Sequence, residues 1–145
     1  MQGLDRARAA WQNEHMYRAT TEAIQVDVEP QFLADRSDPA RNRFFWAYTV
    51  TVTNKGTRTV QLLARHWRIT DGQGRLEEVK GAGVVGEQPI LKPGDRYRYT
   101  SGCPLTTASG FMSGSYRMVD EEGRSFEIDI PTFSLDSPQA RRVLN

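Results

Sequence analysis

Cysteine and histidine are scarce in this sequence. Its 145 residues contain one cysteine, Cys103, and two histidines. A single cysteine excludes an internal disulfide and a multi-cysteine zinc site. This composition is typical of a reducing compartment, so we expect a cytoplasmic location and no metal site.

An excess of charge and a long apolar run are also missing. Lys and Arg number 19 against 18 Asp and Glu, which leaves a formal net charge of +1. Nucleic-acid binding that relies on neutralising phosphates needs a basic excess, so we expect no nucleic-acid partner. No apolar run reaches the length of a bilayer span, and no apolar segment near the start indicates a secretory signal. We therefore expect no membrane insertion.

The first fifteen residues differ from the remainder. Leu4, Arg8, Trp11 and His15 lie near helical spacing, but so short a helix is marginal in water. The His15-Met16 junction resembles what a cloning site leaves behind. We predict that residues 1–15 are a cloning-derived or disordered leader, with a natural extension as the alternative, and that residues 16–145 form a single domain.

Alternation with a period of two dominates the rest, and no segment from Met16 to Leu135 has a convincing helical pattern. In Phe44–Asn54, aromatic and aliphatic residues alternate with Phe45, Ala47 and threonines. The fold class predicted is all-β, an immunoglobulin/fibronectin type III-like antiparallel β-sandwich of about seven strands, with a small barrel as the alternative. Trp67 should be its inter-sheet core aromatic. Seven segments are the expected strands: Ile24–Glu29, Phe44–Asn54, Val60–Thr70, Leu76–Lys80, Arg96–Thr100, Ser115–Asp120 and Phe126–Ile130.

A glycine-rich segment, Gly81-Ala82-Gly83-Val84-Val85-Gly86, matches the pattern G-x-G-x-x-G. A dinucleotide-binding fold needs a helix after this loop, but Pro89 and Pro93 lie where that helix would run. Two interpretations remain. Gly81, Gly83 and Gly86 turn backbone N–H groups towards an anion with Arg65 as the charge partner, or the glycines only permit the geometry of a loop.

The remaining chemistry-bearing residues give weak signals. His66 and Cys103 are candidates for a base and a thiol nucleophile, but nothing in the sequence places them together. Two carboxylate pairs, Asp27 with Glu29 and Glu127 with Asp129, are candidates for a hydrated Mg²⁺, although solvated strand faces explain them more simply. We predict no catalytic residues and no cofactor. The protein is therefore not expected to be an enzyme.

An interaction surface is the other expectation. Phe45 lies on the face of its strand opposite the predicted core, which makes it a candidate contact for a protein partner. Addition of a peptide to an edge strand is a natural binding mode for such a sandwich.

Four ordered motifs resemble the bacterial ApaG family: Ala64–Trp67 (ARHW), Gly81–Pro89 (GAGVVGEQP), Tyr99–Gly102 (YTSG) and Gly110–Tyr116 (GFMSGSY). The resemblance covers Tyr17 to Leu135. It implies a fibronectin type III-like β-sandwich and a link to cobalt resistance and magnesium efflux. Similar domains at the ends of F-box adaptor proteins and of a polymerase-delta-interacting protein imply a role in protein interaction. The family's glycine loop has been discussed as a phosphate or pyrophosphate site, and no enzymatic activity is established for the family.

These observations favour a non-catalytic interaction domain with a protein partner, and a homodimer stays open. The alternative is a phosphate- or pyrophosphate-binding domain using the glycine loop and Arg65. A third hypothesis is direct binding of Co²⁺ or Mg²⁺.

Overall fold

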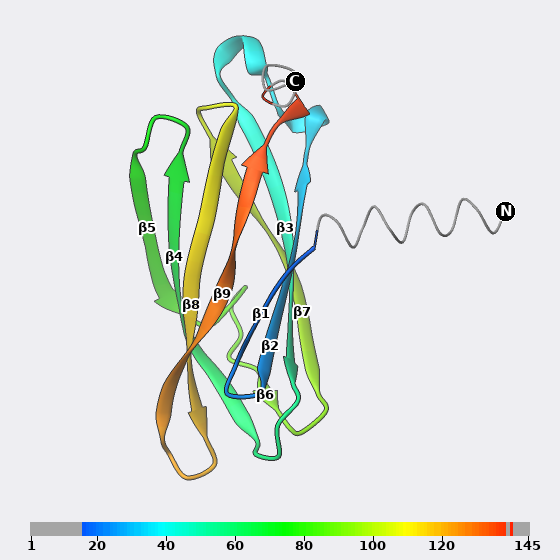
Figure 1. Ribbon diagram of the computed structural model, residues 1–145, viewed down its shortest axis with the longest axis vertical. Helices are drawn as coiled ribbons and strands as arrows, with labels where there is room; N and C mark the ends of the chain where they lie inside the picture. The colour runs from blue at the N-terminus through cyan, green and yellow to red at the C-terminus, as the bar shows by residue number, and fades with distance from the viewer. Residues whose placement is uncertain (1–15, 139, 141–145) are drawn as a thin grey trace, which may run out of the picture.

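The computed structural model describes residues 16–138 and 140, so the predicted leader lies outside the described residues. These residues form nine strands and two 3₁₀ turns, Ala34–Arg36 and Pro39–Arg41 (Figure 1). The strands are β1 (Tyr17–Thr21), β2 (Ile24–Phe32), β3 (Phe44–Asn54), β4 (Val60–Asp71), β5 (Leu76–Ala82), β6 (Ile90–Leu91), β7 (Arg96–Leu105), β8 (Ser109–Asp120) and β9 (Ser125–Asp136).

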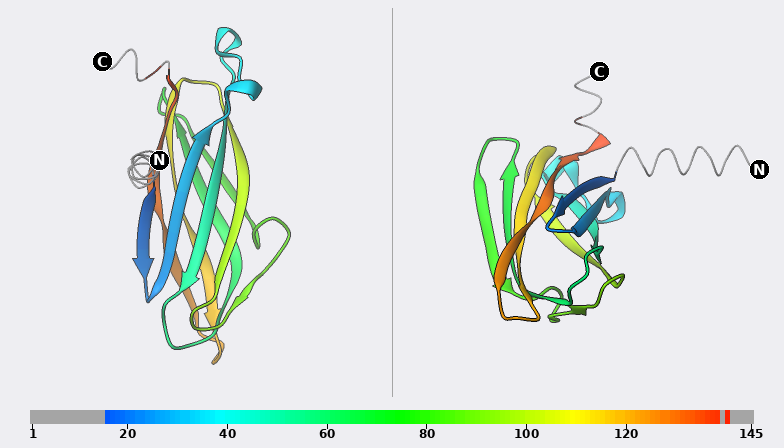
Figure 2. Two further views of the ribbon diagram at one scale, coloured as in Figure 1. Left: turned by 90° about the vertical axis from the view of Figure 1, so that its right-hand side faces the viewer. Right: turned by 60° about the horizontal axis from the view of Figure 1, so that its bottom comes forward.

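Two antiparallel sheets pack face to face, which confirms the predicted sandwich (Figure 2). One sheet has the order β1-β2-β3-β7, and the other has the order β5-β4-β8-β9, with the short β6 also paired to β4. The sequence predicted about seven strands; β1 and β6 are the two that it missed. Among the described residues, no helix is long and apolar enough to cross a membrane.

The core lies between the sheets and is rich in aromatic rings. Trp67 on β4 is 2% exposed and packs edge-on against Tyr48 on β3, with ring centroids 5.1 Å apart. Phe133 on β9 lies 6.0 Å from Trp67 and 6.1 Å from Tyr48. Because Trp67 bridges rings from both sheets, the prediction that it is the inter-sheet aromatic is confirmed.

Strands β2 and β7 continue beyond the predicted ends at Glu29 and Thr100, and each runs through a proline, Pro30 and Pro104. Phe45 directs its N–H to Ser37 and its C=O to Leu33, on the side away from β7. Phe45 and Pro104 are therefore a non-hydrogen-bonded pair, and the proline nitrogen faces the free edge of β7. Because the proline nitrogen faces away from β3, its lack of an N–H removes no hydrogen bond between β3 and β7. The same alternation turns the nitrogen of Pro30 away from β3, at a point beyond the last β1 partner, Val28.

Irregular pairing and close packing of the backbone shape β4 and β8. A bulge between Leu62 and Ala64 shifts the inward-facing positions of β4, so Leu62 is fully buried and Leu63 only half-buried. β8 starts at Ser109 although its first half is rich in glycine and serine. At Gly114 the β4 backbone comes so close that a Cβ atom would lie 2.2 Å from the carbonyl oxygen of His66. Sequence alternation carries no sign of such close approaches.

Two hairpins share one turn sequence, Asp-x-x-Gly-Arg, at Asp71–Arg75 and Asp120–Arg124. In each, the aspartate Oδ1 accepts two backbone N–H groups at 2.9 to 3.0 Å, and the arginine Nε lies 3.3 Å from Oδ2. An Asx side chain that satisfies the turn backbone in this way fixes the strand register on both sides.

The sandwich is closed along one side and open along the other. On the closed side, the Asp129 N–H of β9 donates to Thr21 Oγ1 of β1 at 3.1 Å. On the open side, β5 lies at the margin of its sheet, and the β4–β5 hairpin stands apart from the opposite sheet (Figure 2, right). The open side therefore carries a strand that the opposite sheet leaves largely uncovered.

Candidate functional site

Strand β5 contains no fully buried residue. Its seven residues are exposed except Val79 and Gly81, which are half-buried, and Leu76 is 58% exposed. The sequence Leu-Glu-Glu-Val-Lys-Gly-Ala carried a signal for this, because charges at both odd and even positions leave no apolar face. Sequence analysis placed the strand but missed this property.

The backbone of β5 presents a regular row of hydrogen-bonding groups to solvent. The Gly83 N–H donates to Leu63 O at 2.8 Å, and the Asp71 N–H donates to Arg75 O at 3.0 Å. These two bonds fix the phase of the β4–β5 ladder, so Glu77, Val79 and Gly81 direct their N–H and C=O groups to β4. The N–H and C=O groups of the alternate residues point away from β4, at the free edge: Leu76, Glu78, Lys80 and Ala82.

Arg65 extends from β4 across β5 to this free edge. Its Nη1 donates to the carbonyls of Ala82 and Gly83, each at 3.0 Å. The side chain crosses at Gly81, its register partner, where a Cβ atom would lie 2.8 Å from Nη1. Among the described residues, no carboxylate lies within ion-pair distance of Arg65. The free edge thus holds an unneutralised guanidinium beside a residue with no side chain.

The glycine loop is a miniature hairpin. Val84 and Glu87 exchange two backbone hydrogen bonds of 2.8 and 2.9 Å, with Val85 and Gly86 at the turn in left-handed conformation (φ 44° and 81°). This is a type I′ turn. Gly83 also has positive φ, 64°, and a Cβ there would lie 2.3 Å from Glu87 O. Val84 is fully buried and anchors the loop.

The structure brings Arg65 together with Gly81 and Gly83, as the anion-binding hypothesis requires, while Gly86 lies at the tip of the turn. The loop was expected to present N–H groups to an anion beside Arg65, but the backbone groups that contact Arg65 are carbonyls. The loop turns carbonyls to Arg65, and the N–H groups of Gly83, Val84 and Glu87 have protein acceptors. Loop geometry accounts for Gly83 and Gly86 without a ligand, and anion binding stays a prediction.

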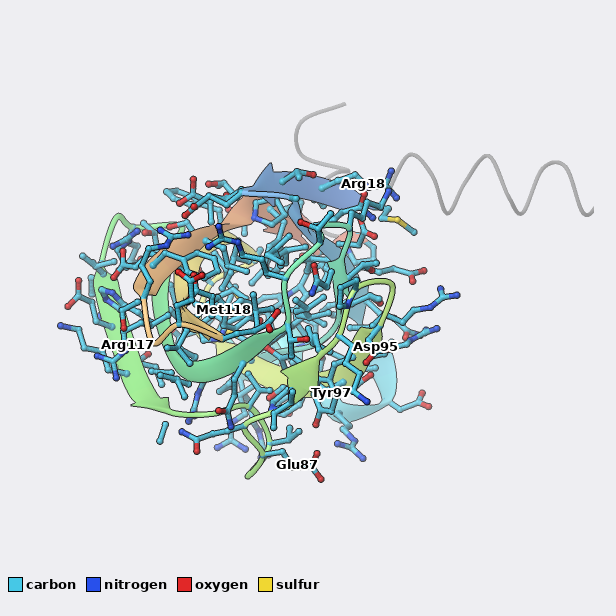
Figure 3. All side chains as sticks on the ribbon, turned by 90° about the horizontal axis from the view of Figure 1, so that it is seen from below. Arg18, Glu87, Asp95, Tyr97, Arg117 and Met118 are labelled. Atoms are coloured by element: carbon cyan, nitrogen blue, oxygen red, sulfur yellow. The ribbon has the colours of Figure 1, made fainter. Side chains whose placement is uncertain are left out.

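Tyrosines line the interior beside Arg65. Tyr99 and Tyr116 are hydrogen-bonded through their hydroxyls. Burial raises the pKa of both phenols well above the ordinary value, and the nearby Arg65 charge opposes this rise. Both phenols therefore stay protonated and act as hydrogen-bonding groups. At the rim, Tyr97 Oη donates to Glu87 Oε2 at 3.3 Å, which joins β7 to the glycine loop (Figure 3).

The two halves of the candidate thiol pair lie in different sheets. Cys103 is buried on the inner face of β7, and burial raises the pKa of its thiol to about 11. His66 pairs with Lys80 and Ser115 on the outer face of the other sheet, 3.7 Å from the Glu78 carboxylate. The structure does not bring the thiol and the imidazole together.

The carboxylate pairs lie on outer sheet faces. Asp27 Oδ1 is 2.6 Å from Arg18 Nε, and Glu127 lies opposite Arg117. Within residues 16–138 and 140, no group of three His, Cys, Asp or Glu side chains is arranged to hold a metal ion. Direct binding of Co²⁺ or Mg²⁺ stays a prediction.

Phe45 lies on the outer face of β3, as predicted, and is half-buried. Its ring covers Gly102 of β7, where a Cβ atom would lie 3.1 Å from the ring. This packing explains why an aromatic residue is tolerated there, and its role in binding a partner stays a prediction.

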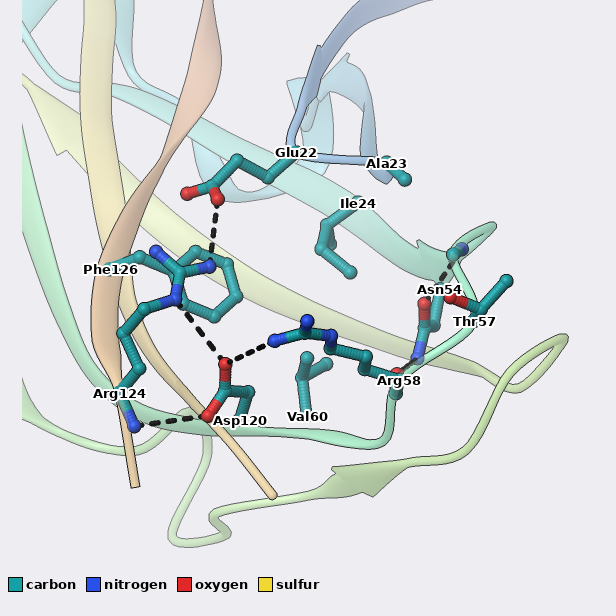
Figure 4. Close-up of a pocket in the computed structure, with 11 residues that line it drawn as sticks. Glu22, Ala23, Ile24, Asn54, Thr57, Arg58, Val60, Asp120, Arg124 and Phe126 are labelled. Atoms are coloured by element: carbon teal, nitrogen blue, oxygen red, sulfur yellow. Dashed lines mark hydrogen bonds and ion pairs between the residues drawn. The ribbon is translucent and has the colours of Figure 1, made fainter. Parts of the chain in front are cut away.

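A cleft of about 460 Å³ lies at the end of the sandwich (Figure 4). The Asp120 side chain, 2% exposed, faces Arg58 Nη1 at 3.4 Å and Arg124 Nε at 3.3 Å, and Arg124 Nη2 is 2.8 Å from Glu22. Backbone N–H groups of Arg124 and Glu122, followed by the Arg124 guanidinium, lower the pKa of Asp120. This network ties the β1–β2, β3–β4 and β8–β9 turns together, and the sequence did not predict it.

Comparison with known proteins agrees with the fold and the motifs. A family model described as the ApaG domain matches residues 34–120. ApaG of Bradyrhizobium diazoefficiens is 63% identical, and ApaG of Methylocella silvestris 64%, each over 130 residues that make up 90% of this chain and 100% of the relative. A crystal structure of a Bordetella pertussis protein described as ApaA superimposes with a TM-score of 0.78 at 47% identity, over 80% of this chain and 94% of that one. The chain therefore belongs to the ApaG family.

Proposed function

We propose that this protein is a non-catalytic interaction domain that binds a protein partner by strand addition to β5. The observation that carries the proposal is the row of outward-facing backbone groups at Leu76, Glu78, Lys80 and Ala82, on a strand in which no residue is fully buried. In strand addition, main-chain hydrogen bonds supply affinity, and side chains at alternate positions supply specificity.

The other sheet edges are less suited to this role. β1 and β9 are joined by the hydrogen bond between Thr21 and Asp129. The free edge of β7 carries the nitrogen of Pro104, which cannot donate, and the exposed Arg96 and Arg98. Proline and clustered positive charge are common protections of an edge strand. β5 has no proline, and its charges are of both signs.

Exposed apolar side chains occur on β5 and on the segment that follows it. Leu76 begins the strand, Val85 lies at the tip of the glycine loop, and Ile90 begins β6; they are 58%, 56% and 61% exposed. Single exposed apolar residues are ordinary, and these three are spread along the margin: Leu76 lies opposite Thr70 of β4, and Ile90 lies opposite Gln61. Leu76 is the one that lies on the β5 edge itself. A link to magnesium efflux or cobalt resistance would then pass through the bound partner.

Site-specific photo-crosslinking in cells tests this proposal. We would place p-benzoylphenylalanine at Leu76, and separately at Phe45 on the opposite sheet. A discrete protein adduct is expected from position 76. Lys80→Pro removes an outward N–H without touching the β4 ladder, so it should abolish the adduct, whereas the matched control Lys80→Arg should keep it. An adduct from position 45 alone, or one that survives Lys80→Pro, would contradict strand addition at β5.

Phosphate or pyrophosphate binding at the glycine loop is the second candidate function. It is favoured by the Arg65 guanidinium, which lies against Gly81 and Gly83 without a carboxylate partner among the described residues. Amide NMR spectra recorded during a pyrophosphate titration, with and without Mg²⁺, would decide. Saturable shifts confined to residues 81–86 and their neighbours would support an anion site, and their absence at millimolar ligand would exclude one.

A further inference from the structure

The side chains of β5 are arranged so that the strand complements itself. Along β5, Leu76, Glu78, Lys80 and Ala82 project from the outer face of the sheet, and Glu77, Val79 and Gly81 from the inner face. Each face thus carries one acidic residue before Val79, the middle residue of the strand: Glu78 on the outer face and Glu77 on the inner face. On the other side, the outer face has Lys80, and the inner face has Gly81 covered by the Arg65 guanidinium.

Symmetry restricts how two copies of this strand can pair. A two-fold axis perpendicular to the sheet leaves every side chain on its own face, so outer-face residues can meet only outer-face residues. The register must then be centred on one residue of β5, with the axis midway between the two strands at the level of that residue. Only a few registers remain, and their cross-strand charges distinguish them.

A register centred on Val79 places unlike charges opposite each other. Glu78 then faces Lys80 of the second copy, and the reciprocal pair forms by symmetry. Both residues direct their backbone groups to the free edge, so each pair exchanges two backbone hydrogen bonds. A shift of the centre by one residue sets Glu78 against Glu78 or Lys80 against Lys80, and directly opposed like charges are destabilising.

The inner face adds a second charge pair in the same register. Glu77 faces Gly81 of the second copy, and the guanidinium of that copy's Arg65 occupies the space over Gly81. Nη1 of Arg65 is engaged by the carbonyls of Ala82 and Gly83, and the guanidinium has further donors for a carboxylate. At the centre of the register, Val79 of one chain lies opposite Val79 of the second copy.

From this match we infer that the partner of β5 is a second copy of this chain, added antiparallel about a two-fold axis at Val79. The inference rests on the proposed function and names its partner. It joins two sheets into one, with β5 against β5 at the centre, and no described strand lies beyond β5 at that margin of the fold (Figure 1). One strand of seven residues is a small interface, so the dimer should be reversible and depend on concentration.

Sedimentation velocity on the full chain, from about 5 to 500 µM, tests the inference. Wild type should pass from monomer to dimer across this range. Lys80→Glu and Glu78→Lys each place like charges opposite each other twice in the dimer, and each should weaken the dimerisation constant by about tenfold or more. The double variant E78K/K80E restores both pairs and should return the constant to within about threefold of wild type.

Each outcome has a distinct meaning. All three variants change exposed residues, and equal thermal midpoints would show that they remain folded. A chain that stays monomeric at 500 µM overturns the dimer, while an adduct of Leu76 with a different protein would still support strand addition. A dimer whose single variants associate as wild type, or whose double variant is not rescued, overturns this register.

Discussion

Gly83→Ala is the sharpest test of how the glycine loop is built. Gly83 has a φ of 64°, and a Cβ atom there would lie 2.3 Å from the carbonyl oxygen of Glu87. That oxygen accepts the Val84 N–H at 2.8 Å, so it cannot retreat without opening the miniature hairpin. The substitution therefore adds backbone strain and removes hydrogen bonds together.

The magnitude follows from these two contributions. An alanine in the left-handed region costs about 1–2 kcal/mol. Opening the hairpin loses two backbone hydrogen bonds, each worth about 1 kcal/mol. Gly83→Ala should thus lower the free energy of unfolding by about 3–4 kcal/mol. Gly86→Ala is the matched control, since Gly86 also has positive φ (81°) but a Cβ atom added there would meet nothing within 4 Å, and it should cost only about 1–2 kcal/mol.

Urea unfolding of the two variants measures this difference. A domain of this length has about 5–15 kcal/mol of stability, so both variants should remain folded at 25 °C. Thermal midpoints should fall by about 10 °C for Gly83→Ala and about 4 °C for Gly86→Ala. Equal costs at the two positions would refute the close approach of Gly83 to Glu87. An unchanged midpoint for Gly83→Ala would contradict this hairpin geometry and favour the interpretation in which the loop turns its N–H groups towards an anion.

Two further predictions concern the buried tyrosines and the end cleft. Tyr116→Phe leaves the buried Tyr99 hydroxyl without its partner and should cost about 1–2 kcal/mol in urea unfolding; adding Tyr99→Phe should add little, and additive costs would contradict a shared hydrogen bond. The pKa of Asp120 is lowered in the folded state, so the stability it contributes is present above about pH 4, the unfolded pKa, and is lost as pH falls through the folded value. Asp120→Asn should have a lower free energy of unfolding than wild type at pH 7, and this free energy should fall less on acidification. Identical dependence on pH in the two proteins would show that the ion-pair network does not contribute to stability.

The sandwich and its core were predictable because alternation is written directly in the sequence. In Phe44–Asn54 every other residue is buried, as the pattern of apolar and threonine residues indicated. Trp67 was recognisable for the same reason, since a large aromatic on a central strand has few places outside an inter-sheet core. Strand ends were less predictable, because Pro30 and Pro104 interrupt a strand only when their nitrogens face a neighbour.

The candidate site was less predictable because it depends on sheet order. Sequence alternation identifies strands but does not say which of them has a neighbour on only one side. The glycine loop attracted attention as a motif, yet the residue that explains Gly81 is Arg65, sixteen positions earlier and opposite it in register. Arg65 was named as the charge partner of an anion; in the structure its partners are the carbonyls of Ala82 and Gly83.

Edge strands have to be protected against unwanted pairing, and the two free edges on the open side differ in this respect. β7 has the nitrogen of Pro104 at its edge, together with Arg96 and Arg98. β5 is protected only by its charged side chains. Because these charges are of both signs, they favour a strand of complementary charge over an arbitrary one. Glu78 precedes Val79 and Lys80 follows it. In the register centred on Val79 these opposite charges face each other, and in the two neighbouring registers like charges face each other. An edge with this pattern discriminates among partners by register, which is the property expected of a binding edge and not of one that is merely kept soluble.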